Sequence, residues 1–133
     1  MARDFGLSER REMALWCFPI VSDLLGERYG RALGPRHTSR RMIAFTHSQL
    51  WHAMLLDDQG AIRKLRAEMS WNMQALGLSF GFADELDDIV LDELMEVVTQ
   101  RFHRSPLKSS ICSHILLHVA RNLAYAAEPV AAA

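Results

Sequence analysis

Apolar residues that recur at helical spacing are the feature that most restricts how this chain can fold. Within the segment 59–76 they return every three or four residues, which places on one side of a helix Ile62, Leu65, Met69, Met73 and Leu76. No segment shows the run of alternating β-branched residues that predicts a strand. The pattern therefore predicts an all-α chain.

Capping and breaking residues divide the chain into five helical segments. We expect helices at about 8–33, 38–56, 59–77, 83–103 and 105–127. Pro19 removes a backbone donor from the first segment, so we expect that helix to kink or divide near Cys17 and Phe18. Ser105 followed by Pro106 is typical of a helix start. A chain of 133 residues, half of them apolar, then predicts a helical bundle of five to six helices in a single domain, 1–133, with an ordered core at about 8–127.

Charge and composition limit the classes of partner. The formal net charge of -1 lacks the basic footprint of most nucleic-acid-binding domains, so we expect no nucleic-acid partner. The apolar runs are too short to span a bilayer and the first residues do not resemble a secretory signal, so we expect no membrane partner and a cytoplasmic location. Cys17 and Cys112 lie in apolar runs, which predicts buried, reduced thiols.

Residues 38–103 resemble the middle of a globin-coupled sensor domain, the haem-binding globin variant found at the front of bacterial signalling proteins. The resemblance rests on the stretch LWHAMLLDDQGAI, on the ALGL that ends the next helix, and on the aromatic turn and long helix that follow. In that family the proximal histidine lies four residues before the glycine of this ending, a position that Met73 occupies here. A thioether is a weak iron ligand normally used beside a histidine. The resemblance therefore implies a globin-like fold without the ordinary haem site.

We accordingly predict a non-enzymatic sensory or regulatory domain in bacterial signalling, without a cofactor, that binds an apolar small ligand or a protein partner. Met73 itself is interpreted as a core side chain. The candidates for a ligand pocket are Phe45, His52, Met69, Met73, Leu76 and Phe80. No nucleophile lies beside a base and no phosphate-binding loop is present, and the acids of the stretch DELDDIVLDELME alternate with apolar residues as on a solvated helix face.

Sensor domains of the resembled family dimerise through their last two helices, and the resemblance thus implies a homodimer. The apolar positions of the last two predicted helices at which we expect such a contact are Leu94, Val98, Ile115 and Val119.

Two alternative functions depend on histidines. A haem or metal site could use His52, or the pair His114 and His118, which lie four residues apart on one helix face. Two histidines are fewer than the three or four ligands zinc needs, and they share a polar stripe with Arg121 and Tyr125, so a solvated or subunit-facing stripe is the favoured interpretation. The second alternative is a histidine phosphotransfer or adaptor protein acting through His47 or His103, both expected to be exposed.

Overall fold

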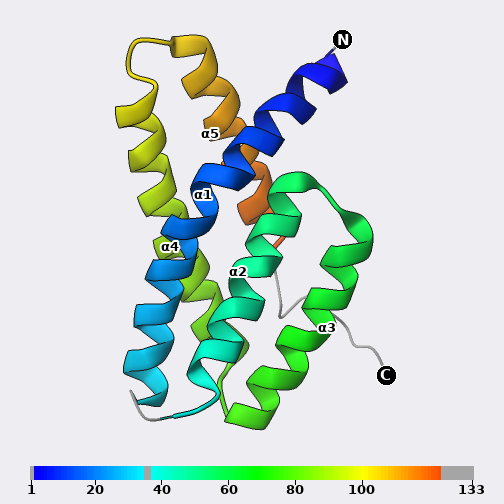
Figure 1. Cartoon of the computed structure of the whole chain (residues 1–133), viewed down its shortest axis with the longest axis vertical. Coiled ribbons are helices and arrows are strands. Elements are labelled where there is room, and N and C mark those ends of the chain that lie inside the picture. Colours follow the sequence, from blue (N-terminus) through cyan, green and yellow to red (C-terminus); the bar gives the residue numbers. More distant parts are fainter. Residues whose placement is uncertain (1, 35–36, 124–133) are drawn as a thin grey trace.

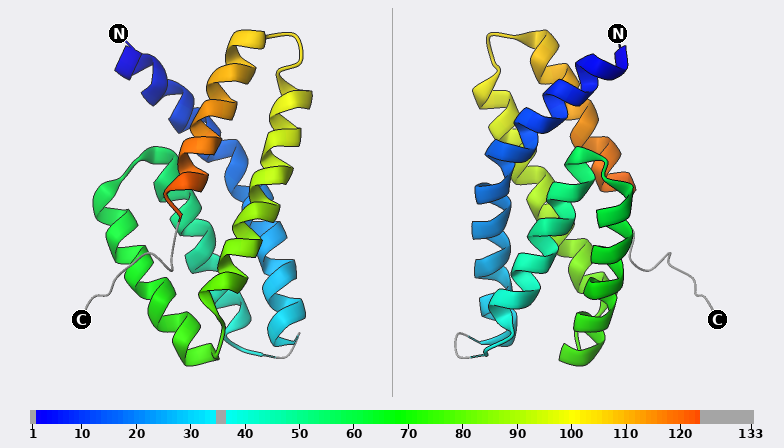
Figure 2. Two further views of the ribbon diagram at one scale, coloured as in Figure 1. Left: turned by 180° about the vertical axis from the view of Figure 1, so that it is seen from behind. Right: turned by 45° about the vertical axis from the view of Figure 1, so that its right-hand side comes forward.

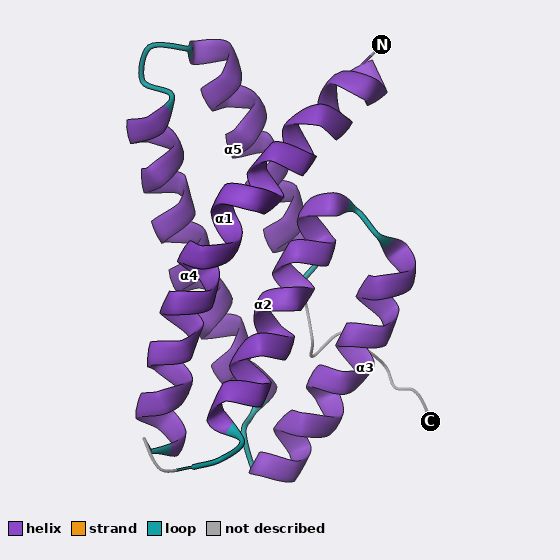
Figure 3. Ribbon diagram, viewed as in Figure 1, coloured by secondary structure: helices purple, strands orange, loops and turns teal. Residues whose placement is uncertain are grey.

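The described part of the chain folds into five helices. The computed structural model describes residues 2–34 and 37–123, and within those ranges no strand occurs. The helices are α1 (Ala2–Leu33), α2 (Arg40–Leu56), α3 (Gln59–Leu76), α4 (Phe80–Arg101) and α5 (Pro106–Arg121), arranged as a helical bundle (Figures 1 and 3). The all-α prediction is confirmed. Among these helices none combines the length and apolar character needed to cross a bilayer.

The turns around α3 follow from single residues. Asp57 adopts a left-handed conformation that ends α2, and the Asp58 carboxylate accepts a hydrogen bond from the Ala61 amide, which starts α3. At the other end Gly77 is left-handed, with φ of 70°, and the Leu78 amide donates to the Met73 carbonyl at 2.9 Å. These bonds confirm the predicted ends of the third helix.

The first helix differs from its prediction. It begins at Ala2 rather than near Ser8. Of the two outcomes expected at Pro19, a kink or a division, division does not occur, because the helix continues through Pro19. The ribbon changes direction along its length, so a bend accommodates the missing hydrogen bond (Figure 1). Pro19 faces solvent, which keeps its ring out of the core.

The last two helices also have different ends. Helix α4 starts at Phe80, one turn earlier than predicted, because the Ser79 hydroxyl accepts a hydrogen bond from the Phe82 amide. Helix α5 ends at Arg121 rather than near residue 127, and the Asn122 side-chain amide donates to the His118 carbonyl at 2.7 Å. Tyr125 and the predicted end at residue 127 lie outside the described residues.

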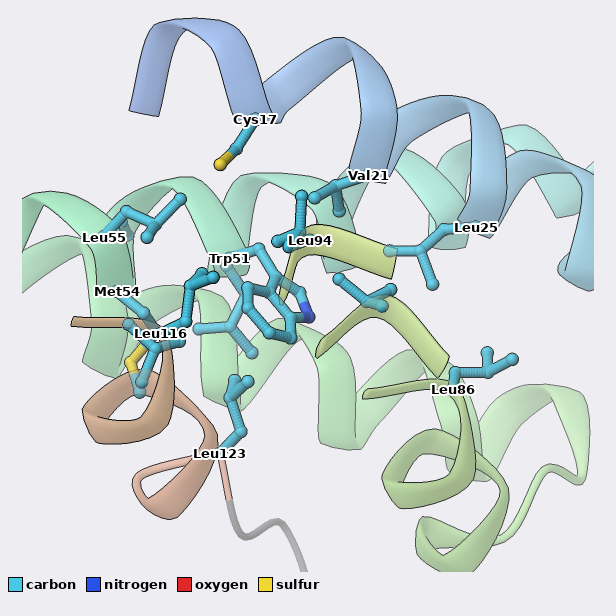
Figure 4. Close-up of a cluster of buried hydrophobic side chains, with 14 of the residues drawn as sticks. Cys17, Val21, Leu25, Trp51, Met54, Leu55, Leu86, Leu94, Leu116 and Leu123 are labelled. Atoms are coloured by element: carbon cyan, nitrogen blue, oxygen red, sulfur yellow. The ribbon is translucent and has the colours of Figure 1, made fainter. Parts of the chain in front are cut away.

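Trp51 of α2 lies at the centre of the core. Its ring is fully buried among apolar side chains from α1, α4 and α5, including Val21, Leu94 and Leu116 (Figure 4). Helices α4 and α5 form an antiparallel pair that lies behind α1 and α2 in the view of Figure 1 and in front of them when the molecule is turned around (Figure 2). Helix α3 packs chiefly against α2 at the edge of the bundle. Cys17 and Cys112 are buried free thiols, as predicted.

The burial of side chains differs from the predictions in two places. Phe45, a candidate for the ligand pocket, is 57% exposed, and the nearby Met42 is 49% exposed. The four residues expected at a dimer contact are instead buried in the core of the chain itself, so they offer no surface to a second copy: Leu94, Val98, Ile115 and Val119. Their apolar stripe is satisfied within one chain.

Candidate functional site

Four polar or amphipathic side chains from three helices meet inside the bundle. The Tyr29 hydroxyl of α1 lies 2.7 Å from Nδ1 of His47 on α2, and Nε2 of that histidine lies 2.7 Å from Oδ1 of Asp87 on α4. The indole N–H of Trp51 donates to the same Asp87 oxygen at 2.9 Å. His47 is 0% exposed and Asp87 is 6% exposed. We call these four residues the buried polar network.

The helical repeat explains how α2 supplies two of its members. His47 and Trp51 are four residues apart, so both side chains lie on the same face of the helix. An indole can only donate, so Asp87 is its acceptor. In the tautomer that carries the proton on Nε2, His47 donates from Nε2 to the Asp87 side chain and accepts at Nδ1 from the Tyr29 hydroxyl. Each of these three hydrogen bonds then has one donor and one acceptor.

Electrostatics keep the tyrosine in its donating form. Burial, followed by the nearby charge of Asp87, raises the pKa of Tyr29 above its ordinary value. The other carboxylate oxygen of Asp87, Oδ2, is buried and has no hydrogen-bond partner among the described residues. The network therefore depends on one oxygen that accepts two hydrogen bonds, and loss of that oxygen affects two helices at once.

The buried polar network is closed to solvent, which argues against catalysis by its side chains. A general base has to come within hydrogen-bond reach of its substrate, and His47 exposes no surface. Tyr29, with its raised pKa, is not an accessible phenolate nucleophile. The arrangement instead fixes α1, α2 and α4 in one relative position, because any sliding of a helix would leave buried polar atoms unpaired.

A surface pocket adjoins this network between the second half of α1 and the first half of α4, which lie next to each other (Figure 2). Its volume is about 250 Å³, and it is lined by Arg28, Arg31, Ala32, Phe82, Glu85, Leu86 and Ile89. We call it the α1–α4 pocket. The Phe82 ring meets the Tyr29 ring edge to face, with centroids 5.7 Å apart. One wall of the pocket is thus in contact with the network.

The predicted ligand-pocket residues are distributed over the core and the surface. Met69 and Met73 are fully buried in the core, in agreement with the interpretation of Met73 as a core side chain. His52 is partly buried, with its ring edge-on to Phe18 at 5.5 Å. Phe45 is exposed and lines a different depression, between α1 and α2. Leu76 and Phe80 are partly buried, and none of the six lines the α1–α4 pocket.

The histidine predictions have mixed outcomes. His47, expected to be exposed, is buried, and hydrogen bonds from its two ring nitrogens to Tyr29 and Asp87 offset the cost of that burial. His103 is exposed at the end of α4, and His114 and His118 are exposed on α5. In the part of the chain that the structure describes, no three metal-ligating side chains come together.

The sequence interpretation missed Tyr29, Asp87 and Arg28 as site residues. A signal for the first two was present. Tyr29 follows the buried residues Val21 and Leu25 at four-residue steps, and Asp87 lies four residues after Ala83 on the buried side of α4. A polar side chain in register with an apolar stripe indicates a buried polar contact. Nothing comparable marks Arg28.

No protein-family model, no curated protein and no solved structure matches this chain.

Proposed function

We propose that this chain is a non-enzymatic sensory or regulatory domain, free of haem, that acts by binding a small apolar ligand. The observation that supports it most directly is the contact between Phe82, in the wall of the α1–α4 pocket, and Tyr29, in the buried polar network. A ligand that displaces Phe82 also shifts the surroundings of Tyr29, and hence the hydrogen bond to His47 on α2. Binding at one surface is thereby coupled to the relative position of three helices.

The site has the composition of a binding site rather than a catalytic one. Its wall is apolar at Phe82, Leu86 and Ile89, with a few charged groups at its edge. His47 and Asp87 are buried in the network next to this wall, whereas the Glu85 carboxylate, which lines the pocket, is exposed to solvent. Ligand occupancy can change packing there without any chemical step.

Native mass spectrometry of protein purified without added cofactor tests the proposal. We expect a small-molecule adduct of defined stoichiometry that is lost on denaturation. A thermal-shift screen with small apolar compounds complements it, since a ligand of the native state raises the unfolding temperature. The bare polypeptide mass together with no stabilising compound would contradict the proposed function.

We also propose that the helices follow a globin-like arrangement, and a substitution at Met73 tests this. Its side chain is fully buried on α3, four residues before the left-handed Gly77. If the helices follow the globin arrangement, Met73→His places an imidazole where the proximal ligand belongs. We expect haemin to give a Soret band with this variant and not with the natural chain. A variant that folds but gives no such band counts against the globin arrangement.

We also propose that the chain forms a homodimer, through a surface on α2 rather than through the last two helices. Met42 and Phe45 project from α2 beside a depression that includes Ser22 and Gly26 of α1. An apolar pair of this kind on a surface is suited to contact with another protein chain. Sedimentation at several concentrations tests it, with a concentration-dependent dimer expected and Phe45→Ser expected to weaken it. A monomer at every concentration would exclude it.

A further inference from the structure

We infer that the α1–α4 pocket binds a small carboxylate with an apolar body, held by the guanidinium of Arg28. This inference rests on the proposed function and names the chemical class of the ligand. The pocket combines two arginines from consecutive turns of α1 with an apolar wall from α4. A cation beside an apolar surface is the complement of an amphipathic acid.

Arg28 differs from its neighbour Arg31 in how its charge is satisfied. Arg31 faces Glu27 across one helical turn at 3.5 Å, and both side chains are exposed. The Nε atom of Arg28 is buried and has no hydrogen-bond partner within the described part of the chain. A guanidinium stays charged in proteins, so an unpaired buried donor on it is costly. The terminal nitrogens of the same guanidinium are not closed off in this way, and they are the donors that a carboxylate in the pocket can reach.

The apolar wall accounts for the rest of the ligand. Phe82, Leu86 and Ile89 lie three or four residues apart on α4, so they follow one face of the helix. The volume of about 250 Å³ is just below the range of typical ligand pockets. The site therefore suits a compact acid with a phenyl ring or a short branched chain rather than a long-chain lipid.

Glu85 decides between two sources of such a carboxylate. Its side chain is exposed at the edge of the pocket, one residue before Leu86. A plain acid requires Glu85 to turn towards water, whereas an apolar amino acid could pair its ammonium group with Glu85 and its carboxylate with Arg28. Both ligands share the carboxylate on an apolar body, and they differ only at the amino group.

The experiment is an NMR titration of the full, isotope-labelled chain that follows the Nε–H signal of Arg28. The probes are hydrocinnamate, its neutral amide as a control, and phenylalanine. We expect saturable binding of one or both carboxylates with displacement of the Arg28 signal, and at least about tenfold weaker binding of the neutral amide, because a charge-assisted hydrogen bond is lost. Binding of phenylalanine that Glu85→Gln weakens would assign the amino-acid source.

Matched variants separate the role of Arg28 from general effects of charge. Arg28→Gln should weaken the binding of the carboxylates by about tenfold or more. Arg63 is an exposed arginine on α3, and Arg63→Gln should leave this binding unchanged. Ile89→Glu places a repelling carboxylate in the apolar wall and should abolish binding even if the Arg28 variant fails to fold. Circular dichroism confirms folding of each variant.

Two results would overturn the inference: no saturable binding of either carboxylate, or equal binding to the natural chain and the folded Arg28→Gln variant. A retained ligand of another chemical class would overturn the inference and leave the proposed function standing. Absence of any ligand in the mass spectra and in the compound screen would remove both.

Discussion

Helices α2 and α3 are neighbours of nearly equal length, yet they are held in different ways. Ten of the seventeen residues of α2 are buried, whereas three of the eighteen residues of α3 are. Helix α2 contacts α1, α3 and α5, and through His47 and Trp51 it also bonds to Asp87 of α4. Helix α3 packs chiefly on α2 through a single stripe that contains Ile62, Met69 and Met73.

The difference indicates which helix the rest of the molecule depends on. Displacement of α2 would expose Trp51 and leave buried polar atoms on α1 and α4 without partners. Displacement of α3 exposes a few apolar side chains and breaks the hydrogen bond that Arg66 donates to the Asn122 carbonyl, which lies at an exposed position. Helices with few buried contacts open at a lower free energy than the core does. We therefore expect α3 to open independently and α2 only with global unfolding.

The largest loss of stability is expected when Asp87, the acceptor that both His47 and Trp51 of α2 share, is removed. Asp87→Ala leaves the Trp51 and His47 donors unpaired in the core, and since each unpaired buried donor costs about 1–3 kcal/mol, it should lower the free energy of unfolding by about 2–5 kcal/mol. Urea denaturation measures the change. The matched control is Asp88→Ala, because Asp88 is the adjacent exposed acid, and it should change stability by about 0.5 kcal/mol at most. Equal effects of the two variants would contradict a special role for the network.

A cavity under α3 should cost less than loss of the network. Met69→Ala removes a fully buried side chain, for which about 2–3 kcal/mol is expected, at the low end of the usual range because a helix at the edge of the bundle can relax into the space. Hydrogen exchange should accelerate in α3 more than in α2. Glu68→Ala, at the exposed neighbouring position, serves as control. Uniform acceleration across both helices would argue against independent opening of α3.

The same contrast explains how much the sequence alone could predict. The inner stripe of α3 is purely apolar, so its periodicity predicted the buried face, and Asp58 and Gly77 predicted its ends. On α2 the buried face includes His47 and Ser48, while Met42 and Phe45 are exposed. Hydrophobicity alone therefore predicts the burial of Leu50 and Trp51 correctly, but not that of these four residues.

The candidate site was less predictable than the fold for a physical reason. Each member of the buried polar network satisfies its hydrogen bonds with a residue at least 18 positions away in sequence. Local periodicity can show that Asp87 is in register with an apolar stripe, but it cannot show that His47 and Trp51 are its partners. The α1–α4 pocket likewise exists only because α1 and α4 pack side by side.

A smaller change at the other end of the network concerns the tyrosine hydroxyl. Tyr29→Phe keeps the ring and leaves Nδ1 of His47 without its donor, which should cost about 1–2 kcal/mol. The cost should shrink above about pH 10, where an unfolded tyrosine begins to lose its proton. Because burial raises the pKa of Tyr29 in the folded state, the natural chain loses stability there and the variant, which lacks this group, does not.

Comparing the free energy of unfolding of the natural chain and of the Tyr29→Phe variant across a range of pH isolates the contribution of the tyrosine hydroxyl. Burial also raises the pKa of Cys17 to about 12 and that of Cys112 to about 11, so both proteins lose stability as the pH rises above about 9. The thiols are common to both proteins and cancel in the difference. A difference between the two curves that stays constant from pH 8 to about pH 11 would show that Tyr29 does not contribute as described.

The smallest effect is expected where α3 ends. Gly77 has φ of 70°, and a Cβ built there meets no other atom within 4 Å, so Gly77→Ala introduces backbone strain without a clash. We expect a loss of about 1 kcal/mol, and less for Gly77→Asn, since asparagine tolerates the left-handed conformation better. Gly30→Ala is the matched control, because Gly30 also has open space around its Cβ position but lies within α1. Alanine there should stabilise the chain by about 0.5–1 kcal/mol. Opposite signs at two equally open glycines would show that backbone conformation, and not contact, fixes the end of α3, whereas equal signs would contradict this.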